Sequence, residues 1–353
     1  MGILILRGSS ASGGAIADGA AYTITGSGFG TRSTSQEWLG GLNGVIDSMA
    51  NGDRFDQLGR AGWSLLTPST SRYPTCSTER AWSRGKSLVH DTRGGAEYKQ
   101  SLFFDATSYS SMYTSNKCYL AHDTLTTGYL QHKMIRWLRT ETVVDGDGSY
   151  MANRLGATRD SFLNTFNSAG TSTYWMDGTA GTTPLPTAGS WYHLETWLKM
   201  NSTPGTADGY FRVRVTDPSA GTVLMDNVST NRVYNGSSDS GTYRYICFQN
   251  YFGNADVGEP SGAGNGNAHG VMWWDDHLIQ YGTSDDALKI CYLTDASTWA
   301  ASTVKEVQPV SSWADTSISL TINQGAHANL TGKYFHLFAG IPSAQVGSGI
   351  LLA

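Results

Sequence analysis

Two neighbouring stretches of the chain alternate between apolar and polar residues with a period of two, and this pattern constrains the fold most. The first stretch, residues 191–200, reads WYHLETWLKM, and the second, residues 210–216, reads YFRVRVT. Successive side chains of a β-strand point to opposite faces, so one set in each stretch faces a core and the other faces outward. The intervening segment 201–209 contains Pro and Gly and is typical of a turn. The sequence therefore predicts a β-hairpin.

The rest of the chain is also typical of strands joined by turns. Further strands are predicted at 98–104, 129–140, 242–252 and 269–281. The chain holds 42 glycines among 353 residues, which suits many tight connections. A helix is predicted only at 36–50, where internal glycines weaken it. Many short strands predict an all-β protein.

Charge and apolar patterning exclude several classes of protein. The net charge is −5 and no run of Lys or Arg occurs, so no nucleic-acid partner is expected. No apolar run approaches 18 residues, so no membrane span is expected, and the start MGILILRGSS does not have the pattern of a signal peptide. The four cysteines lie far apart. Their spacing favours four buried thiols, with disulfides left open.

The central region resembles a known superfamily. The hairpin strands WYHLETWLK and DGYFRVRV, with WWDDHLIQY at 273–281, resemble the concanavalin-A-like lectin/glucanase superfamily. The resemblance covers residues 36–285 and implies a jelly-roll sandwich. It also implies that one bent sheet carries the glycan on its concave face, in members that bind one.

The two ends of the chain resemble one Ig-like domain. Residues 18–31 end in GSGFGT and resemble the opening of a TIG (IPT) domain, while WADTSISLTI at 313–322 and GKYFHLF at 332–338 look like its back half. This resemblance implies a discontinuous TIG-like domain made of residues 1–35 and 286–353, with the jelly roll inserted in it. The alternative is that residues 1–35 form an edge strand of the large sandwich.

The outward set of the hairpin is rich in aromatic and charged residues. Aromatic rings stack on sugar C–H faces, and charged forks bind hydroxyls or carboxylates. The outward residues of the hairpin, together with one face of the strand at 129–140, therefore predict a glycan-binding surface. Besides the candidates named next, that face of the strand holds Tyr129, Gln131, Ile135 and Trp137. The candidate residues are Trp191, His193, Glu195, Trp197, Lys199, Tyr210, Arg212, Arg214, Lys133 and Arg139. The alternative is that Trp191 and Trp197 pack under a loop or against the Ig-like module, while the arginines pair with nearby acids.

Catalytic and metal signatures are weak. Gln131 and His132 are adjacent and point to opposite faces, and Glu195 has no acidic neighbour two or four positions on. A non-enzymatic role is therefore favoured, with no catalytic residue, and a polysaccharide lyase or hydrolase acting on an acidic polysaccharide is the alternative. No cofactor is predicted. Residues 145–148, DGDG, resemble the start of a calcium loop but lack its later ligands, and Asp275 and Asp276 are expected on opposite faces.

The role predicted from these features is that of a virion surface structural protein. Ig-like modules that carry glycan-binding sandwiches and lack a signal peptide recur among the exposed proteins of tailed bacteriophages, as decoration, fibre or tail components. The expected partners are a glycan or polysaccharide and other virion proteins, in a homo-oligomer on the virion surface or outside the cell. A purely architectural virion protein without a ligand is a further alternative.

Overall fold

The computed structural model describes most of the chain, and its elements are almost all strands. The described residues are 10–13, 16–32, 35–38, 45–55, 63–64, 73–91, 98–121, 132–138, 148–154, 161–166, 172–175, 189–203, 206, 208–232, 243–252, 271–339 and 344–352. Within these ranges the helical elements are α1 (Val45–Ser48) and the 3-10 turn η3 (Asp285–Leu288). The predicted all-β fold class is confirmed.

An eight-stranded antiparallel sheet is the centre of the molecule. Its strands, in spatial order, are β15 (Thr222–Arg232), β14 (Gly209–Asp217), β13 (Ser190–Lys199), β8 (Ser111–Leu120), β17 (Val271–Gly282), β6 (Ser87–Asp91) and β5 (Thr75–Ser77), and β3 (Ser35–Trp38) pairs with β17. The predicted hairpin is β13–β14, which pairs from His193 opposite Thr216 to Lys199 opposite Tyr210. This prediction is confirmed.

A seven-stranded sheet packs on one face of the eight-stranded sheet and completes the large sandwich. Its order is β12 (Ser172–Trp175), β11 (Ser161–Phe166), β10 (Gly148–Arg154), β9 (His132–Leu138), β16 (Tyr243–Phe252), β7 (Tyr98–Tyr109) and β4 (Trp63–Ser64). The core between the sheets is apolar: Trp137 of β9 meets Phe211 of β14 edge-on, with ring centroids 5.5 Å apart. Strands distant in sequence pair within each sheet, as in a jelly roll.

Both ends of the described chain meet in a second, smaller sandwich. One sheet runs β1 (Ser10–Gly13), β2 (Ala21–Thr25), β21 (Ser317–Thr321) and β20 (Val310–Trp313). The other runs β19 (Lys305–Val307), β18 (Ile290–Thr294), β22 (Tyr334–Ala339) and β23 (Ala344–Leu351). Thus β2 pairs with β21, almost 300 residues later in the chain. That this small sandwich is a TIG-like domain stays a prediction.

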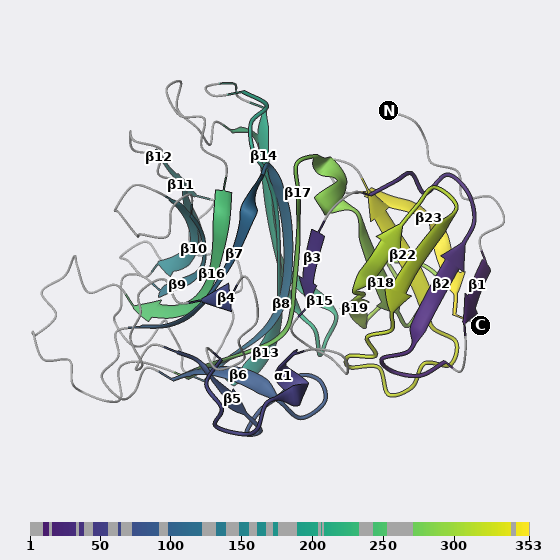
Figure 1. The fold of residues 1–353 in the computed structure, drawn as a ribbon, viewed down its shortest axis with the longest axis horizontal. Coiled ribbons are helices and arrows are strands. Elements are labelled where there is room, and N and C mark those ends of the chain that lie inside the picture. The colour runs from purple at the N-terminus through teal and green to yellow at the C-terminus, as the bar shows by residue number, and fades with distance from the viewer. Residues whose placement is uncertain are drawn as a thin grey trace, which may run out of the picture.

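The four sheets stack side by side, with the eight-stranded sheet and the β18 sheet in contact (Figure 1). The side chains of β18 alternate between these two sandwiches. Ile290 and Tyr292 pack toward the large sandwich, whereas Cys291 and Leu293 pack into the core of the small sandwich. Burying both faces of a strand requires apolar or satisfied side chains on both. The contact between the sandwiches is therefore part of the folded core.

Two further sequence predictions can be judged from the fold. The helix expected at 36–50 is wrong at its start, because residues 35–38 form β3, in which Trp38 pairs with Leu278. Only Val45–Ser48 is helical, and residues 39–44 lie outside the described residues. The prediction of four buried thiols is confirmed, since all four cysteines are free and buried.

Candidate functional site

The outward set of the β13–β14 hairpin lies between the two sandwiches. Trp197 and Tyr210 are 1% and 2% exposed and pack in one cluster with Tyr292 and Phe338 of the small sandwich. The prediction that both rings face solvent is wrong, because the small sandwich covers this part of the sheet. For Trp197 the alternative prediction, that its ring packs against the smaller module at the chain ends, describes the structure: the ring packs against the small sandwich.

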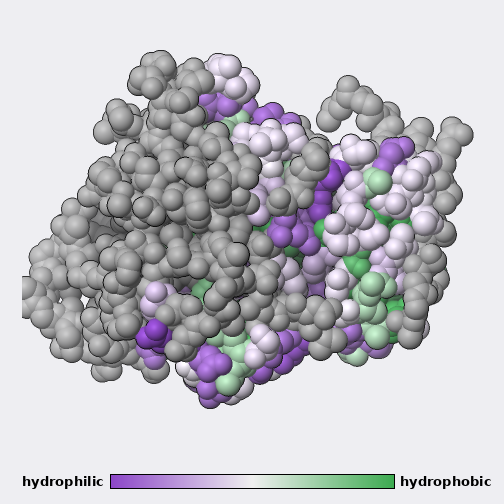
Figure 2. All heavy atoms as spheres, in the orientation of Figure 1, coloured by the Kyte–Doolittle hydropathy of each residue, from purple (hydrophilic) through white to green (hydrophobic). Residues whose placement is uncertain are grey.

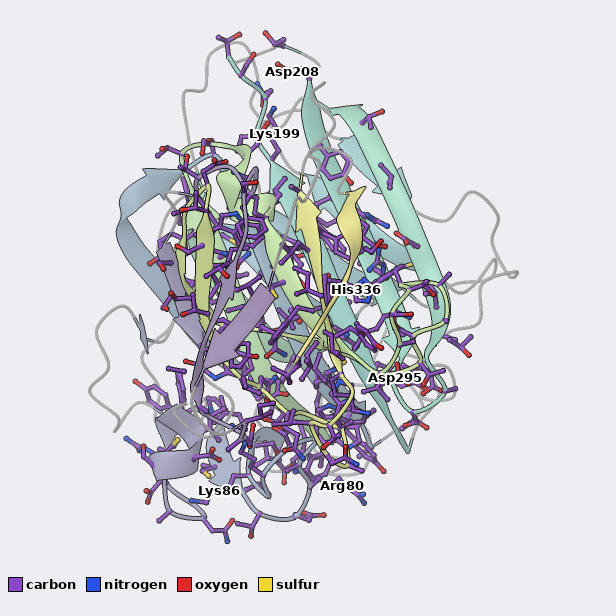
Figure 3. The ribbon with its side chains drawn as sticks, turned by 90° about the vertical axis from the view of Figure 1, so that its right-hand side faces the viewer. Arg80, Lys86, Lys199, Asp208, Asp295 and His336 are labelled. Carbon is purple, nitrogen blue, oxygen red and sulfur yellow. The ribbon has the colours of Figure 1, made fainter. Side chains whose placement is uncertain are left out.

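The two ends of the same face on β13 differ from its centre. Trp191 is partly exposed, and its ring packs against those of Trp82 and Tyr119, with centroids 6.2 and 5.5 Å away. At the other end Lys199 pairs with Asp285 across 3.1 Å in an exposed position. Lys199 lies near the end of the molecule opposite Arg80 (Figure 3). Solvent therefore reaches the hairpin face at its ends.

The strand at 129–140 was predicted to add one of its faces to the glycan-binding surface, and this prediction is wrong for the two residues of that face whose side chains the structure describes. Ile135 and Trp137 are fully buried in the core of the large sandwich, not on an outer surface. The pairing of β9 with β10 shifts by one residue between Ile135 and Lys133, so the two-residue alternation does not carry across this point. The side chain of Lys133 and all of Tyr129, Gln131 and Arg139 lie outside the described part of the structure.

The carboxylate of Glu195 is the buried centre of the interface. Tyr113 and Tyr292 donate hydrogen bonds from their hydroxyls to Oε1, Tyr113 at 2.6 Å, and Arg214 approaches Oε2 at 3.5 Å. Burial alone would raise the pKa of Glu195, but His193, Arg214 and the two hydroxyls outweigh it and lower that pKa to about 2. Because His193 is itself neutral near neutral pH, Arg214 and the hydroxyls keep Glu195 ionised.

Two arginines and one aspartate continue the charged layer toward the sheet edge. Arg212 holds Asp226 with two hydrogen bonds of 2.6 and 2.7 Å, and Arg214 donates a third of 3.2 Å. Both guanidinium groups also lie over the ring of Trp197, at 4.9 and 5.2 Å from its centroid. This is the arrangement of arginines paired with local acids that the sequence left as an alternative.

His193 does not carry a positive charge at neutral pH. Its side chain is 3% exposed, and Nε2 lies 2.7 Å from the hydroxyl of Ser115. Burial, with help from the nearby Lys117 ammonium, lowers the pKa of His193 to about 4. The imidazole can therefore exchange a hydrogen bond with a ligand but does not attract an anion.

Between the sandwiches the interface opens into a groove. Its cavity has a volume of about 90 Å³. The walls come from both sandwiches: His193, Glu195, Arg214, Thr216, Pro218, Val223 and Asp226 on one side, and Tyr292, Trp299, Thr303 and Lys305 on the other. Hydrophilic residues gather along the line where the sandwiches meet (Figure 2). Two predicted candidates besides His193 reach this groove, namely Glu195 and Arg214.

A tight backbone contact joins the two sandwiches beside the groove. Gly221, in the turn between β14 and β15, has a φ of +67°, and a Cβ there would lie 2.5 Å from the carbonyl oxygen of Thr303. Any side chain at this position would push the turn away from the small sandwich. The close approach of Gly221 to Thr303 thus limits the separation of the two sandwiches at this point.

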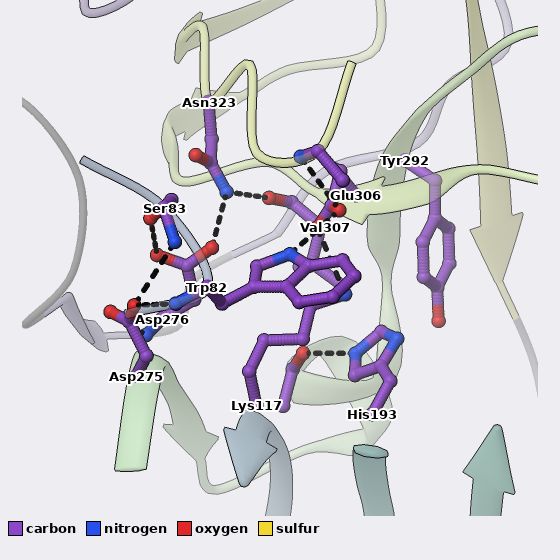
Figure 4. Close-up of polar contacts among 12 residues, drawn as sticks. Trp82, Ser83, Lys117, His193, Asp275, Asp276, Tyr292, Glu306, Val307 and Asn323 are labelled. Atoms are coloured by element: carbon purple, nitrogen blue, oxygen red, sulfur yellow. Dashed lines mark hydrogen bonds and ion pairs between the residues drawn. The ribbon is translucent and has the colours of Figure 1, made fainter. Parts of the chain in front are cut away.

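Behind the groove lies a buried ion pair (Figure 4). Lys117 on β8 meets Glu306 on β19 at 3.0 Å, and the two side chains are 2% and 1% exposed. The indole of Trp82 and the backbone amide of Ala326 both donate to Oε1 of Glu306, at 3.0 and 3.1 Å. Burial would raise the pKa of Glu306, but Lys117 and the other partners lower it overall. This ionic contact links the two sandwiches, as does the ion pair between Arg84 of the large sandwich and Asp18 of the small one.

Asp275 and Asp276 do not point to opposite faces, so that prediction is wrong. Asp276 has a φ of +48°, and the pairing of β17 with β8 shifts between Asp275 and Leu278. Both carboxyls reach the segment at 82–83: Asp275 accepts from the amides of Trp82 and Ser83, and Asp276 accepts from the Ser83 hydroxyl (Figure 4). Burial, together with neighbouring carboxylates, raises the pKa of both.

No metal ligand set is found in the described ranges. No group of three or more His, Cys, Asp or Glu side chains among these residues is arranged to hold an ion. The calcium-like segment 145–147 lies outside them, as does most of its surroundings.

None of the helices in the part of the chain that the structure describes has the length and apolar character needed to span a membrane.

Sequence reasoning missed the groove residues from the small sandwich and from β15. Trp299, Thr303 and Lys305 lie in and after the connection from β18 to β19, and Asp226 lies on β15, for which no strand was predicted. One signal was present. Residues 290–293 read ICYL, and such a run without polar alternation is typical of a strand buried on both faces. It indicates that the C-terminal module packs against something.

Comparisons with known proteins show no family for this chain. No family model matches the chain, and no curated protein matches it. The solved structure of alginate lyase Aly36B is 14% identical over 70% of this chain and 96% of its own, with a TM-score of 0.43. The cellulose-induced protein Cip1 is 12% identical (69% and 96%, TM-score 0.38), and lectin I-B4 from Griffonia simplicifolia is 9% identical (69% and 98%, TM-score 0.34). Similarities of this size assign no activity to the chain, so its function must be inferred from its own residues.

Proposed function

We propose that this protein binds carbohydrate without altering it chemically, and that the ligand lies in the groove between the sandwiches. The observation that carries the proposal is the cavity of about 90 Å³ where charged, hydroxyl and apolar side chains from both sandwiches converge. A concave site with a few convergent polar groups is the usual form of a small-ligand site. The groove thus replaces the open platform that the sequence predicted.

The groove has the mixed chemistry that a sugar requires. Sugar hydroxyls both donate and accept hydrogen bonds. Glu195 and Asp226 offer acceptors, Arg214 offers donors, and the Thr216 hydroxyl does both. Val223, which is 49% exposed, gives a C–H face of the sugar an apolar surface at the same place. The ion pairs of the arginines hold these groups in position before a ligand arrives.

The same groups are poorly suited to hydrolysis. A glycosidase needs one carboxylic acid with a raised pKa as a proton donor. Glu195 has a pKa lowered to about 2, and the pKa of Asp226 is also lowered, because the hydrogen bonds of the arginines outweigh burial. Neither carboxylate retains a proton at neutral pH. The groove therefore supports binding better than catalysis.

Calorimetric titration with a panel of oligosaccharides tests this proposal. Val223→Trp fills the groove mouth and is expected to weaken the best ligand by about tenfold or more. Val228→Trp is the matched control, since Val228 lies on the same strand, is 48% exposed and does not line the cavity. Equal binding by Val223→Trp and the unaltered protein would place the ligand elsewhere. A panel without any ligand would favour the purely architectural role.

A second candidate function is a polysaccharide lyase on the seven-stranded sheet. The backbone register sets Lys133 opposite Tyr251, and Tyr251 opposite Tyr98, across three adjacent strands, with Gln249 opposite Gln100 nearby. Jelly-roll lyases use Gln or Arg to neutralise a uronate and Tyr or His to take its C5 proton. Incubation with alginate and glucuronan, followed by absorbance of the unsaturated product, tests this. Turnover that Tyr251→Phe abolishes would support the lyase over the binding protein.

The setting we propose is the one that the sequence predicts. The protein belongs to the surface of a virion or to the extracellular space, as a homo-oligomer that also contacts other virion proteins. Its few charges and strand-rich build support this setting. Immunogold labelling of particles from the source organism tests the location, and sedimentation equilibrium tests the oligomer.

A further inference from the structure

Lys305 differs from the other cations at the interface. It is half-buried, donates one hydrogen bond of 2.6 Å to the carbonyl of Ser302, and lies 4.9 Å from the centroid of the Trp299 ring. Among the described residues it has no ion-pair partner. Four other cations there each have at least one. Arg212 pairs with Asp226, and Arg214 pairs with both Asp226 and Glu195. Lys117 pairs with Glu306, and Lys199 pairs with Asp285. The Lys305 ammonium therefore has spare donors in the groove.

The surroundings of Lys305 make this charge costly without a ligand. Burial, and then the neighbouring Arg214 guanidinium, lower the pKa of Lys305 and outweigh Asp295 and Glu195, which raise it. Arg214 and Lys305 line the same cavity, and both lie over Trp299, at 5.9 and 4.9 Å from its ring centroid. Two cations held around one cavity favour an anion between them.

The charges that line the groove differ in whether they already have a partner. Arg214 and Lys305 contribute two positive charges, and Glu195 and Asp226 contribute two negative charges. Both carboxylates are engaged, by Tyr113, Tyr292 and the arginines. Arg214 is paired with them, and Asp295 acts on Lys305 without forming an ion pair. Within the cavity lining, Lys305 is thus the charge that has room for a carboxylate.

We propose that Lys305, assisted by Arg214, forms an anion subsite that receives the carboxylate of a uronic acid residue. This inference rests on the proposed carbohydrate-binding function and names its substrate class, an acidic polysaccharide. The ammonium of Lys305 makes a charge-assisted hydrogen bond to the carboxylate at the cavity wall. Thr303, beside Lys305 in the lining, adds a polar neighbour to the sugar ring.

The test compares an oligouronate with its carboxyl-reduced, neutral counterpart by calorimetric titration. The unaltered protein is expected to bind the oligouronate about tenfold more tightly than the neutral sugar. Lys305→Met removes that preference, because it weakens the oligouronate about tenfold more than it weakens the neutral sugar. Lys305→Arg retains the preference, because it keeps the charge. Lys333→Met is the matched control, as Lys333 does not line the cavity.

The outcomes separate this inference from the proposed function. Equal affinity of the unaltered protein for the two sugars overturns the anion subsite and leaves carbohydrate binding in place. A Lys305→Met protein that loses both sugars equally also overturns it, because the lysine would then act on the shape of the groove. If neither sugar binds, the proposed function itself fails and the subsite falls with it.

Discussion

The eight-stranded sheet packs against another sheet on each of its two faces, and the two contacts use different chemistry. The inner face, toward the seven-stranded sheet, packs Leu194, Leu198 and Phe211 in an apolar core. The outer face, toward the small sandwich, buries Glu195 and Lys117 with their partners. Apolar burial stabilises by about 1.5–3 kcal/mol for each large side chain, whereas a buried ion pair roughly balances its own desolvation. The inner face therefore provides stability, and the outer face fixes how the sandwiches sit.

This difference explains why a groove can persist in the outer contact. An apolar interface closes over its voids, because each void forfeits contacts. Side chains held by several directed bonds cannot collapse in this way. Asp226 is held by Arg212 and Arg214, and Glu195 by two tyrosine hydroxyls, so the walls keep their places around the cavity.

The largest expected effect comes from breaking the buried ion pair on one side. Lys117→Met leaves the carboxylate of Glu306 charged and 1% exposed without its ammonium partner. We expect the free energy of unfolding to fall by about 3–5 kcal/mol, measured by urea denaturation. Combining Lys117→Met with Glu306→Leu removes both charges and should recover most of that loss.

These two variants test whether the two faces of the eight-stranded sheet contribute differently to stability. If the double variant stays as unstable as Lys117→Met, the ion pair contributes net stability and the outer face resembles the inner one. If Lys117→Met costs less than about 1 kcal/mol, the contact between the sandwiches is not part of the cooperative core.

A pH titration of stability gives the next effect. The pKa of Glu195 is lowered to about 2 in the folded protein, from 4.5. A lowered carboxyl pKa contributes stability that is present above pH 4.5 and is lost as pH falls from 4.5 toward 2. The expected loss is about 3 kcal/mol, measured as the fall in unfolding free energy across this window.

Glu195→Gln is the control for this window. The variant is less stable at neutral pH but loses less between pH 4.5 and 2, because it has no proton to gain. His193, whose pKa is lowered to about 4, acts in the same direction but mostly at higher pH, between 6.5 and 4. An equal fall in both proteins across the lower window would show that another group dominates.

Much of the fold, and little of the site, follows from the sequence. The two-residue alternation at 191–200 correctly separates Leu194 and Leu198 from Glu195 and Trp197. Alternation identifies the faces of a strand but not what covers the polar one. That depends on pairings over long distances in the chain, such as the contact of Tyr292 with Glu195. The shift at β9 and the positive φ of Asp276 also escape a pattern that assumes regular strands.

The smallest expected effect lies at the end of the hairpin, where the outer face meets solvent. Lys199 and Asp285 are 30% and 51% exposed, so water and salt screen their ion pair. We expect Lys199→Met to change the free energy of unfolding by less than about 0.5 kcal/mol in urea denaturation. Lys117 and Lys199 lie on neighbouring strands of one sheet and both form ion pairs at about 3 Å. If Lys199→Met lowers the free energy of unfolding by more than about 1 kcal/mol, contact geometry determines the contribution of these ion pairs to stability. If Lys199→Met has a negligible effect and Lys117→Met a large one, burial determines it.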